Sequence, residues 1–221
     1  MAPNSDLPKS FGLLVYPGFE ALDAFGPMEV VNTLSCTHDM TLAVIAATRD
    51  PVSTQSKGVH AVGQSVVPTH TFADAPPLDV LFIPGGWGGF NTGPETLEFL
   101  RRVVPKTGHL ITVCNGSAVA AQAGLLDGKR ATTNKAFWKD CVAYGPKTEW
   151  VAQARWVQDG NIWTSSGVSA GIDAALAWVG SIFGEDKATD IANNMEFVRT
   201  TSSTSDPFSP MFKCEDVPRQ S

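Results

Sequence analysis

Short apolar runs alternate with longer segments of mixed polarity along most of this chain. The clearest runs span residues 11–16, 41–47, 79–86 and 109–114. Apolar runs of about four to eight residues predict strands that are buried on both faces. The segments between and after them have helical spacing, above all residues 94–104, 115–126, 167–184 and 185–197. This alternation predicts a mostly parallel sheet with helices on both faces, in which ligands bind at the carboxyl ends of the strands.

Three local signals refine this picture. Pro27 predicts that the first helix begins near it, because proline suits a first helical turn. The Asp-Gly pair at 159–160 predicts a hairpin, and residues 64–72 predict minor strands. We therefore expect one domain over residues 10–199, followed by a C-terminal tail over residues 200–221. Because the tail is rich in Ser, Thr and Pro, we expect it to form an arm or to be partly disordered.

Composition narrows the classes of function. Hydrophobic residues make up 43% of the 221 residues, charged residues make up 17%, and the net charge is −6. This acidic balance disfavours nucleic acid or an anionic membrane as a partner, since both need a basic surface. No apolar run approaches the ~18 residues of a membrane span, and the polar N-terminus has no signal-peptide core. We expect a cytoplasmic protein that acts on a small molecule.

The four cysteines are expected to be free thiols. Cys36, Cys114, Cys141 and Cys214 are widely and irregularly spaced, and no CxxC pair is present. The four histidines are equally scattered, so the sequence predicts neither a zinc site nor a disulfide framework.

One cysteine has the setting of a nucleophile. A buried strand runs into Cys114, and a helix begins at once with the turn-tolerant residues Asn115, Gly116 and Ser117. Such a turn exposes the sulfur and places it at a helix N-terminus, where the dipole and free N–H groups stabilise a thiolate. The alternative is a buried and inert thiol, which is the expected state of the other three cysteines.

A glycine-rich loop and an acid are the other candidates for chemistry. The segment IPGGWGGF at residues 83–90 follows an apolar strand, so Gly86 and Trp87 can offer backbone N–H groups beside Cys114. The alternative is a plain tight connection. Asp23 lies in the otherwise apolar stretch ALDAFGPM. Burial there would raise its pKa and make it a proton donor, whereas the alternative is an acid in the first turn of a helix.

Taken in this order, Asp23, Pro84-Gly85-Gly86 and Cys114 resemble the motifs of the ThiJ/PfpI superfamily, and the resemblance covers roughly residues 10–197. The stretches LDAFGPMEV, LFIPGGWGG, VCNGSAVAAQAGLLDGKRATT and RWVQDGNIWTSSGVSAGIDAAL are most similar to the isonitrile hydratase subgroup. The resemblance implies an α/β sandwich of the flavodoxin-like or class I glutamine amidotransferase-like type. It also implies a homodimer with the site near the subunit interface.

The resemblance further implies roles for single residues. Cys114 is the implied nucleophile, and Asp23 is the acid that faces it. The implied backbone N–H donors are Gly86, Trp87 and Asn115. The candidates for the substrate pocket are Trp87, Phe90, Asn134, Phe137 and Trp138. Packing in the core or on the surface is the alternative role for each aromatic ring.

Two positions depart from the family pattern. Asn115 stands where isonitrile hydratases have Thr directly after the cysteine. Asn134, in the segment ATTNKAFW, stands where many members have His. An amide cannot act as a general base at neutral pH, so no Cys–His dyad is expected.

Three functions are compatible with these residues. The first is a cysteine-dependent hydro-lyase that hydrates an isonitrile to an N-substituted formamide through a Cys114 thioimidate, with Asp23 as general acid and without a cofactor or metal. The second is cofactor-free glyoxalase or deglycase chemistry on dicarbonyls, which Asn134 disfavours because that chemistry normally uses a His. The third is a redox sensor or holdase whose Cys114 is oxidised to a sulfinate.

Overall fold

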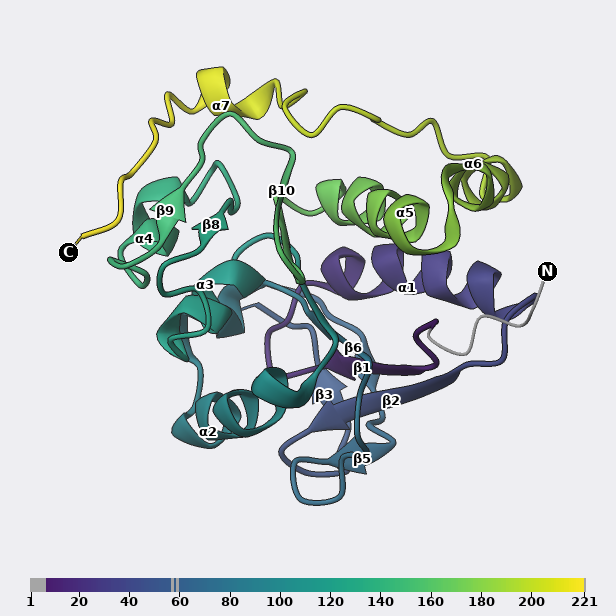
Figure 1. The fold of residues 1–221 in the computed structure, drawn as a ribbon. Helices are drawn as coiled ribbons and strands as arrows, with labels where there is room; N and C mark the ends of the chain where they lie inside the picture. The colour runs from purple at the N-terminus through teal and green to yellow at the C-terminus, as the bar shows by residue number, and fades with distance from the viewer. Residues whose placement is uncertain (1–6, 57, 59, 221) are drawn as a thin grey trace.

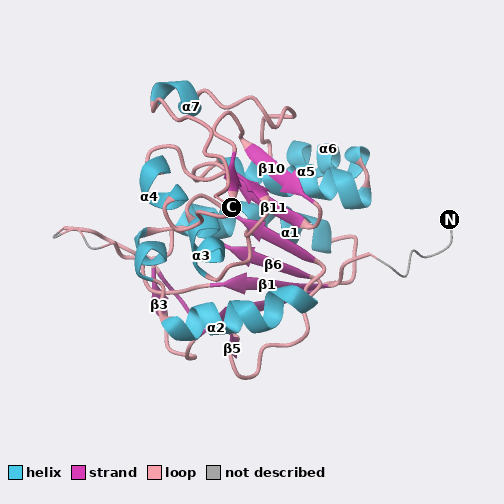
Figure 2. Ribbon diagram, turned by 60° about the vertical axis from the view of Figure 1, so that its left-hand side comes forward, coloured by secondary structure: helices cyan, strands magenta, loops and turns pink. Residues whose placement is uncertain are grey.

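A seven-stranded sheet forms the centre of the protein, in a computed structural model that describes residues 7–56, 58 and 60–220. The strand order is β10-β11-β7-β6-β1-β2-β5 (Figures 1 and 2). Neighbouring strands are parallel except β10 and β11, which form the predicted antiparallel hairpin. The strands are β1 (Ser10–Leu14), β2 (Thr41–Ala46), β5 (His70–Thr71), β6 (Val80–Ile83), β7 (His109–Thr112), β10 (Trp156–Asp159) and β11 (Ile162–Ser165).

Helices cover both faces of this sheet because its central strands are apolar on both sides. Every residue of β6 is buried, and so is every residue of β1 and β7 after the first. One group of helices contains α1, α5 and α6, and α2 and α3 lie on the opposite side of the strands (Figure 1). These helices are α1 (Ala21–Ser35), α2 (Pro94–Val103), α3 (Gly116–Gln122), α5 (Ala170–Phe183) and α6 (Glu185–Asn194). The predicted three-layer α/β fold is confirmed.

The first helix begins earlier than its proline suggests. Helix α1 starts at Ala21, so Pro27 lies inside it, and the prediction that the helix begins near Pro27 is wrong. Pro27 lacks the N–H group that would complete the helical hydrogen bond at its position. Its ring packs so closely on α5 that a Cβ added at Gly171 would lie 3.1 Å from it. A Cβ at the neighbouring Gly26 would lie 2.8 Å from α5. Close packing between the two helices therefore offsets the lost hydrogen bond.

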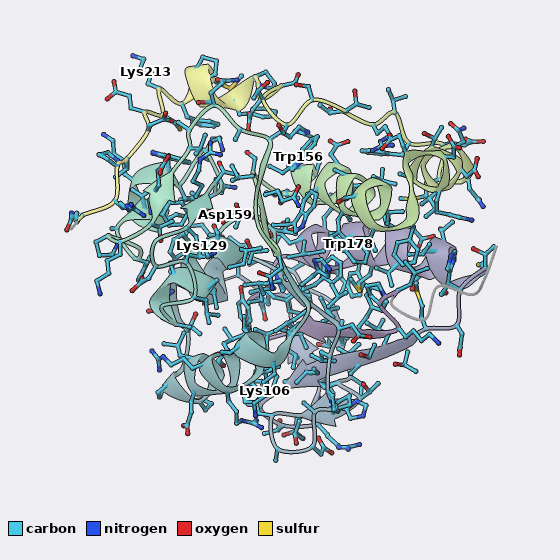
Figure 3. All side chains as sticks on the ribbon, viewed as in Figure 1. Lys106, Lys129, Trp156, Asp159, Trp178 and Lys213 are labelled. Atoms are coloured by element: carbon cyan, nitrogen blue, oxygen red, sulfur yellow. The ribbon has the colours of Figure 1, made fainter. Side chains whose placement is uncertain are left out.

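Smaller elements surround the sheet. Two short strand pairs and three short helical segments are β3 (Val52–Ser53) with β4 (Ser65–Val66), β8 (Arg130–Ala131) with β9 (Glu149–Trp150), η1 (Trp87–Asn91), η2 (Val104–Lys106) and α4 (Trp138–Val142). Asp159 links the β8 region to the end of β10. It accepts a hydrogen bond from the Arg130 N–H at 2.9 Å and forms an ion pair with Lys129 Nζ at 3.5 Å (Figure 3). No helix in the described part of the chain is both long and apolar enough for a membrane span.

The C-terminal tail packs across the domain. From α6 it passes β10, forms the short helix α7 (Phe208–Met211) and ends beside β9, where Val217 pairs with Trp150 (Figure 1). The Thr200 N–H donates a hydrogen bond to buried Asp173 at 2.7 Å. The described residues of the tail pack on the domain through buried polar contacts, whereas we expected an arm or a partly disordered segment. The domain boundary at residue 200 stays a prediction.

Candidate active site

Cys114 lies two residues after the end of β7, at the carboxyl edge of the sheet and between β6 and β11. Its φ of 57° is in the left-handed region, which costs a non-glycine residue on the order of 1–3 kcal/mol. The Cys114 N–H donates to the Ser166 carbonyl at 3.1 Å. The Cys114 carbonyl accepts hydrogen bonds from Ser117 Oγ at 3.0 Å and Thr133 Oγ1 at 3.1 Å. This strained turn between a strand and a helix is the predicted nucleophile elbow.

Two glycines let the segments of the site approach one another. A Cβ at Gly116 would overlap the carbonyl oxygen of Ile83 at the end of β6. A Cβ at Gly85 would overlap the amide oxygen of Asn115 and lie 2.8 Å from Asp23 Oδ2. The glycine-rich loop therefore lies directly against the elbow, as the Pro-Gly-Gly motif predicts.

The Cys114 sulfur is buried among hydrogen-bond donors. Cys114 is 6% exposed, and Asn134 Nδ2 donates to its Sγ at 3.0 Å. The backbone N–H groups of Val168 and Asn115 also hydrogen-bond to it. Burial raises the pKa of Cys114 well above its usual value, the nearby Asp23 raises it further, and the three donors lower it. The prediction of an exposed sulfur is therefore wrong, and burial acts against the thiolate that the helix N-terminus was predicted to stabilise.

Asp23 is the acid that faces this thiol. It is 2% exposed, and its Oδ2 accepts a hydrogen bond from the Gly85 N–H at 2.8 Å. Burial raises the pKa of Asp23 to about 7, the Gly85 hydrogen bond opposes this shift, Glu20 adds to it, and the adjacent Cys114 side chain opposes it. A substantial fraction of Asp23 is therefore protonated at neutral pH, which is the state that a proton donor requires.

Asn115 joins the glycine-rich loop to the elbow through its side chain. Its Oδ1 accepts a hydrogen bond from the Gly86 N–H at 2.7 Å, and its Nδ2 donates to the Gly86 carbonyl at 2.8 Å. In contrast to the prediction, the Gly86 N–H is occupied within the protein and is not free to bind an oxyanion. The Asn115 N–H points to the sulfur. The Trp87 N–H stays a predicted donor.

Three of the predicted aromatic residues form a cluster beside the sulfur. The ring centroid of Trp87 lies 6.2 Å from that of Phe90 and 5.3 Å from that of Phe137. Trp87 is 49% exposed. The Phe137 N–H donates to Asn134 Oδ1 at 3.1 Å, so the cluster is linked to the amide that contacts the sulfur. Trp138 differs, because its ring packs 6.4 Å from Trp150 and it is 6% exposed. These contacts are those of a core residue.

Three residues around Asp23 and Cys114 were not predicted from the sequence. Tyr16 is buried, and its hydroxyl donates to the Pro84 carbonyl at 2.6 Å. Burial, then Asp23 and Cys114, raise the pKa of Tyr16 well above its usual value. Val168, with φ of 35°, lies in the quoted GVSAGID run, so the resemblance could have found it. Lys135, 3% exposed beside Asn134, gave no signal because lysine is rarely buried.

The DJ-1/PfpI family model matches residues 9–180, and the chain belongs to this family. The chain is 35% identical over 191 residues to an isonitrile hydratase of Pseudomonas putida. The matched region covers 84% of this chain and 77% of the hydratase. A ThiJ/PfpI family protein of Pseudomonas syringae has a TM-score of 0.76 at 28% identity and covers 93% of this chain and 84% of that one. Drosophila melanogaster DJ-1beta shares the fold, with a TM-score of 0.68 at 23% identity over 86% of this chain and 98% of that one.

Proposed function

We propose that this protein is a cysteine-dependent enzyme that hydrates an isonitrile, R–N≡C, to an N-substituted formamide. The observation that carries the proposal is the burial of the Asp23 carboxyl near Cys114, which raises the pKa of Asp23 to about 7. An isonitrile carbon becomes electrophilic only after protonation, so the reaction needs an acid directly beside the nucleophile. The 35% identity to an isonitrile hydratase supports the choice of substrate.

The first half of the proposed reaction forms a covalent adduct. Asp23 transfers its proton to the terminal carbon of the isonitrile, and the Cys114 sulfur attacks the resulting nitrilium carbon to give the thioimidate R–N=CH–S–Cys. The thiol proton passes to the Asp23 carboxylate, which restores the acid. The hydrogen bonds from Asn134, Asn115 and Val168 stabilise the negative charge that develops on the sulfur.

The second half releases the product. Water adds to the thioimidate carbon while Asp23 delivers a proton to the nitrogen and its carboxylate takes up the proton that the water releases, giving R–NH–CH(OH)–S–Cys. The C–S bond then breaks, and the proton of the hydroxyl group returns to the sulfur. The products are R–NH–CHO and the free thiol, so one water is consumed and no cofactor takes part.

The site geometry favours hydration over the two alternatives. Glyoxalase chemistry needs a base that shuttles protons, whereas position 134 offers an amide that donates to the sulfur. Oxidation to a sulfinate proceeds through an accessible thiolate, whereas burial raises the pKa of Cys114 and leaves the residue 6% exposed.

A turnover assay tests the proposal. Purified protein is incubated with methyl or cyclohexyl isonitrile, and formamide is measured by chromatography, with methylglyoxal and lactate in parallel. We expect formamide from wild type and none from Cys114→Ala, whose fold is checked by circular dichroism. Lactate without formamide would favour the glyoxalase alternative, and full turnover by Cys114→Ala would remove the nucleophile assignment.

The proposal includes a homodimer with the site near the interface. Leu22 and Phe25 flank Asp23 on α1, and each is 44% exposed although it is apolar. Trp87, at the other side of the site, is 49% exposed. A second copy that covers these side chains would remove apolar surface from water at the mouth of the site. Light scattering after size exclusion should give twice the chain mass, and Phe25→Glu should give the mass of one chain.

A further inference from the structure

A cavity of about 230 Å³ lies beside the elbow, between segments that are far apart in the chain. Residues 134–136 and 166–169 form one side, and Phe208 and Phe212 of the tail form the other. The tail with α7 crosses this end of the molecule in Figure 1, and Lys213, which follows Phe212, marks it in Figure 3. The tail therefore forms part of the wall of this cavity.

The cavity is bounded by residues that hold the reacting sulfur. Asn134 and Val168 both line it. Asn134 Nδ2 lies 3.0 Å from Cys114 Sγ, and the Val168 N–H also hydrogen-bonds to this sulfur. The cavity and the sulfur therefore share Asn134 and Val168 as a common boundary.

Two aromatic rings of the tail face this space together. Phe208 and Phe212 are four residues apart, and the Phe212 N–H donates to the Phe208 carbonyl at 2.9 Å, so helical geometry places both rings on one face. They are 41% and 49% exposed, which is unusual for two neighbouring large apolar side chains. A ligand that fills the cavity would bury part of both rings.

A buried ion pair fixes the two walls against each other. Asp206 Oδ1 accepts a hydrogen bond from the Phe208 N–H at 2.8 Å, and Asp206 Oδ2 lies 3.6 Å from Lys135 Nζ. Lys135 directly follows Asn134, and both side chains of the pair are almost fully buried. Because each charge is paired inside the protein, the cavity offers no free charge to a ligand.

We infer that the tail determines substrate specificity, with Phe208 and Phe212 holding a neutral, apolar, ring-sized R group beside Cys114. This inference rests on the proposed function and names its substrate class. A cavity of about 150 Å³ is enough for a benzene ring in another protein, so this one has room for a cyclohexyl or benzyl group. Linear or cyclic isonitriles with a charged R group would be excluded, since burial of an unpaired charge is costly.

The first test compares kcat/KM for cyclohexyl and methyl isonitrile. Removing a ring that buries the substituent should lower kcat/KM for cyclohexyl isonitrile about tenfold in Phe208→Ala and in Phe212→Ala, while the value for methyl isonitrile changes less than about twofold. The matched control is Met211→Ala, because Met211 lies on the same short helix, is 65% exposed and does not line the cavity. An equal loss for both substrates, or an equal effect of Met211→Ala, would overturn the inference.

The second test does not depend on isonitrile turnover. Cys114 is labelled with N-cyclohexylmaleimide or N-methylmaleimide, and peptide mass spectrometry separates it from the other thiols. We expect the ratio of the cyclohexyl rate to the methyl rate to fall about tenfold in the two Phe variants and to stay unchanged in Met211→Ala. If no isonitrile reacts but this ratio falls, the proposed function is contradicted, whereas the role of Phe208 and Phe212 in specificity is supported. If isonitriles react but neither the ratio of kcat/KM values nor the ratio of labelling rates changes, the proposed function is supported and the role of Phe208 and Phe212 in specificity is contradicted.

Discussion

Two of the buried pairs of ionisable side chains among the described residues, Asp23 with Cys114 and Arg155 with Asp173, differ in the sign of their charges. In the first pair, burial raises the pKa of both Asp23 and Cys114, and the charge of Asp23 raises the pKa of Cys114 further. Arg155 and Asp173 have opposite charges and lie 2.6 Å apart, and Asp173 also accepts the hydrogen bond from Thr200 that anchors the tail. The first pair retains protons that it can transfer. The second pair is satisfied and fixes structure.

The difference has a cost in stability at the site. Raising the pKa of Asp23 from 3.8 to about 7 means that the folded state binds a proton that the unfolded state has released. Its stabilising contribution is fully present below about pH 3.8 and is lost as pH rises through about 7. Relative to acid pH, this loss reaches about 4 kcal/mol at high pH. The site is therefore held together by the rest of the fold.

The largest expected effect is on the acid of the site. Asp23→Asn keeps an oxygen that can accept the Gly85 hydrogen bond but removes the transferable proton. We expect the hydration rate to fall about 10²–10⁴-fold. Steady-state assays measure this loss, and alkylation of Cys114 checks that the thiol stays reactive. The matched control is Glu29→Gln, an exposed acid on the same helix, and equal rates for Asp23→Asn and wild type would return Asp23 to a structural role.

The second effect is on stability at the opposite-charge pair. Asp173→Asn leaves the Arg155 charge buried without its partner, and we expect the free energy of unfolding to fall by about 3–5 kcal/mol. Urea titration measures this change. Asp127→Asn breaks the ion pair with Lys147, in which the side chains are 45% and 65% exposed, and should cost less than about 1 kcal/mol. Similar losses in the two variants would mean that burial does not distinguish the pairs.

The third effect is a gain in stability at the site. Asp23→Asn removes a carboxylate whose burial is unfavourable above pH 7, so the variant should be more stable than wild type by up to about 4 kcal/mol at pH 9. The gain should shrink as pH falls below about 7. Urea titrations at pH 5 and pH 9 measure it. A difference that does not change with pH would contradict the raised pKa of Asp23.

The smallest expected effect is at the amide that contacts the sulfur. Asn134→Ala removes one of three donors to Cys114 Sγ, so the pKa of the thiol should rise further and thiolate chemistry should slow about tenfold. The pH dependence of Cys114 alkylation measures this change. The control is Thr133→Val, which removes a hydrogen bond to the Cys114 carbonyl and leaves the sulfur contacts in place. An unchanged alkylation profile in Asn134→Ala would show that the amide does not stabilise the thiolate.

The sheet and the elbow could be predicted because their signals are local. Buried apolar runs mark β1, β6 and β7, and the small residues after Cys114 mark the turn. The start of α1 could not be predicted, because the packing of Pro27 on α5 joins residues that are far apart in the chain. The balance of effects on the Cys114 pKa could not be predicted either, because it depends on how completely the fold buries the sulfur.

The tail shows the same limit. Its composition indicates an arm, and only the fold reveals that Asp206 reaches Lys135 and that Phe208 lies beside Asn134. Each of these contacts joins the tail to a segment about 70 residues earlier, and no pattern within the tail specifies such a pairing. The place of Phe208 and Phe212 in the candidate pocket could therefore not be predicted from the sequence, whereas the roles of Asp23 and Cys114 could.

The most direct test of covalent catalysis by Cys114 is to trap the adduct between its sulfur and the isonitrile. Wild-type protein is mixed with one equivalent of cyclohexyl isonitrile, quenched in acid within one turnover and analysed by intact mass spectrometry. We expect a species heavier by the mass of the isonitrile, located on Cys114, which appears before the formamide and is absent in Cys114→Ala. Formamide that forms with no such adduct, at the same rate in both proteins, would contradict covalent catalysis by Cys114.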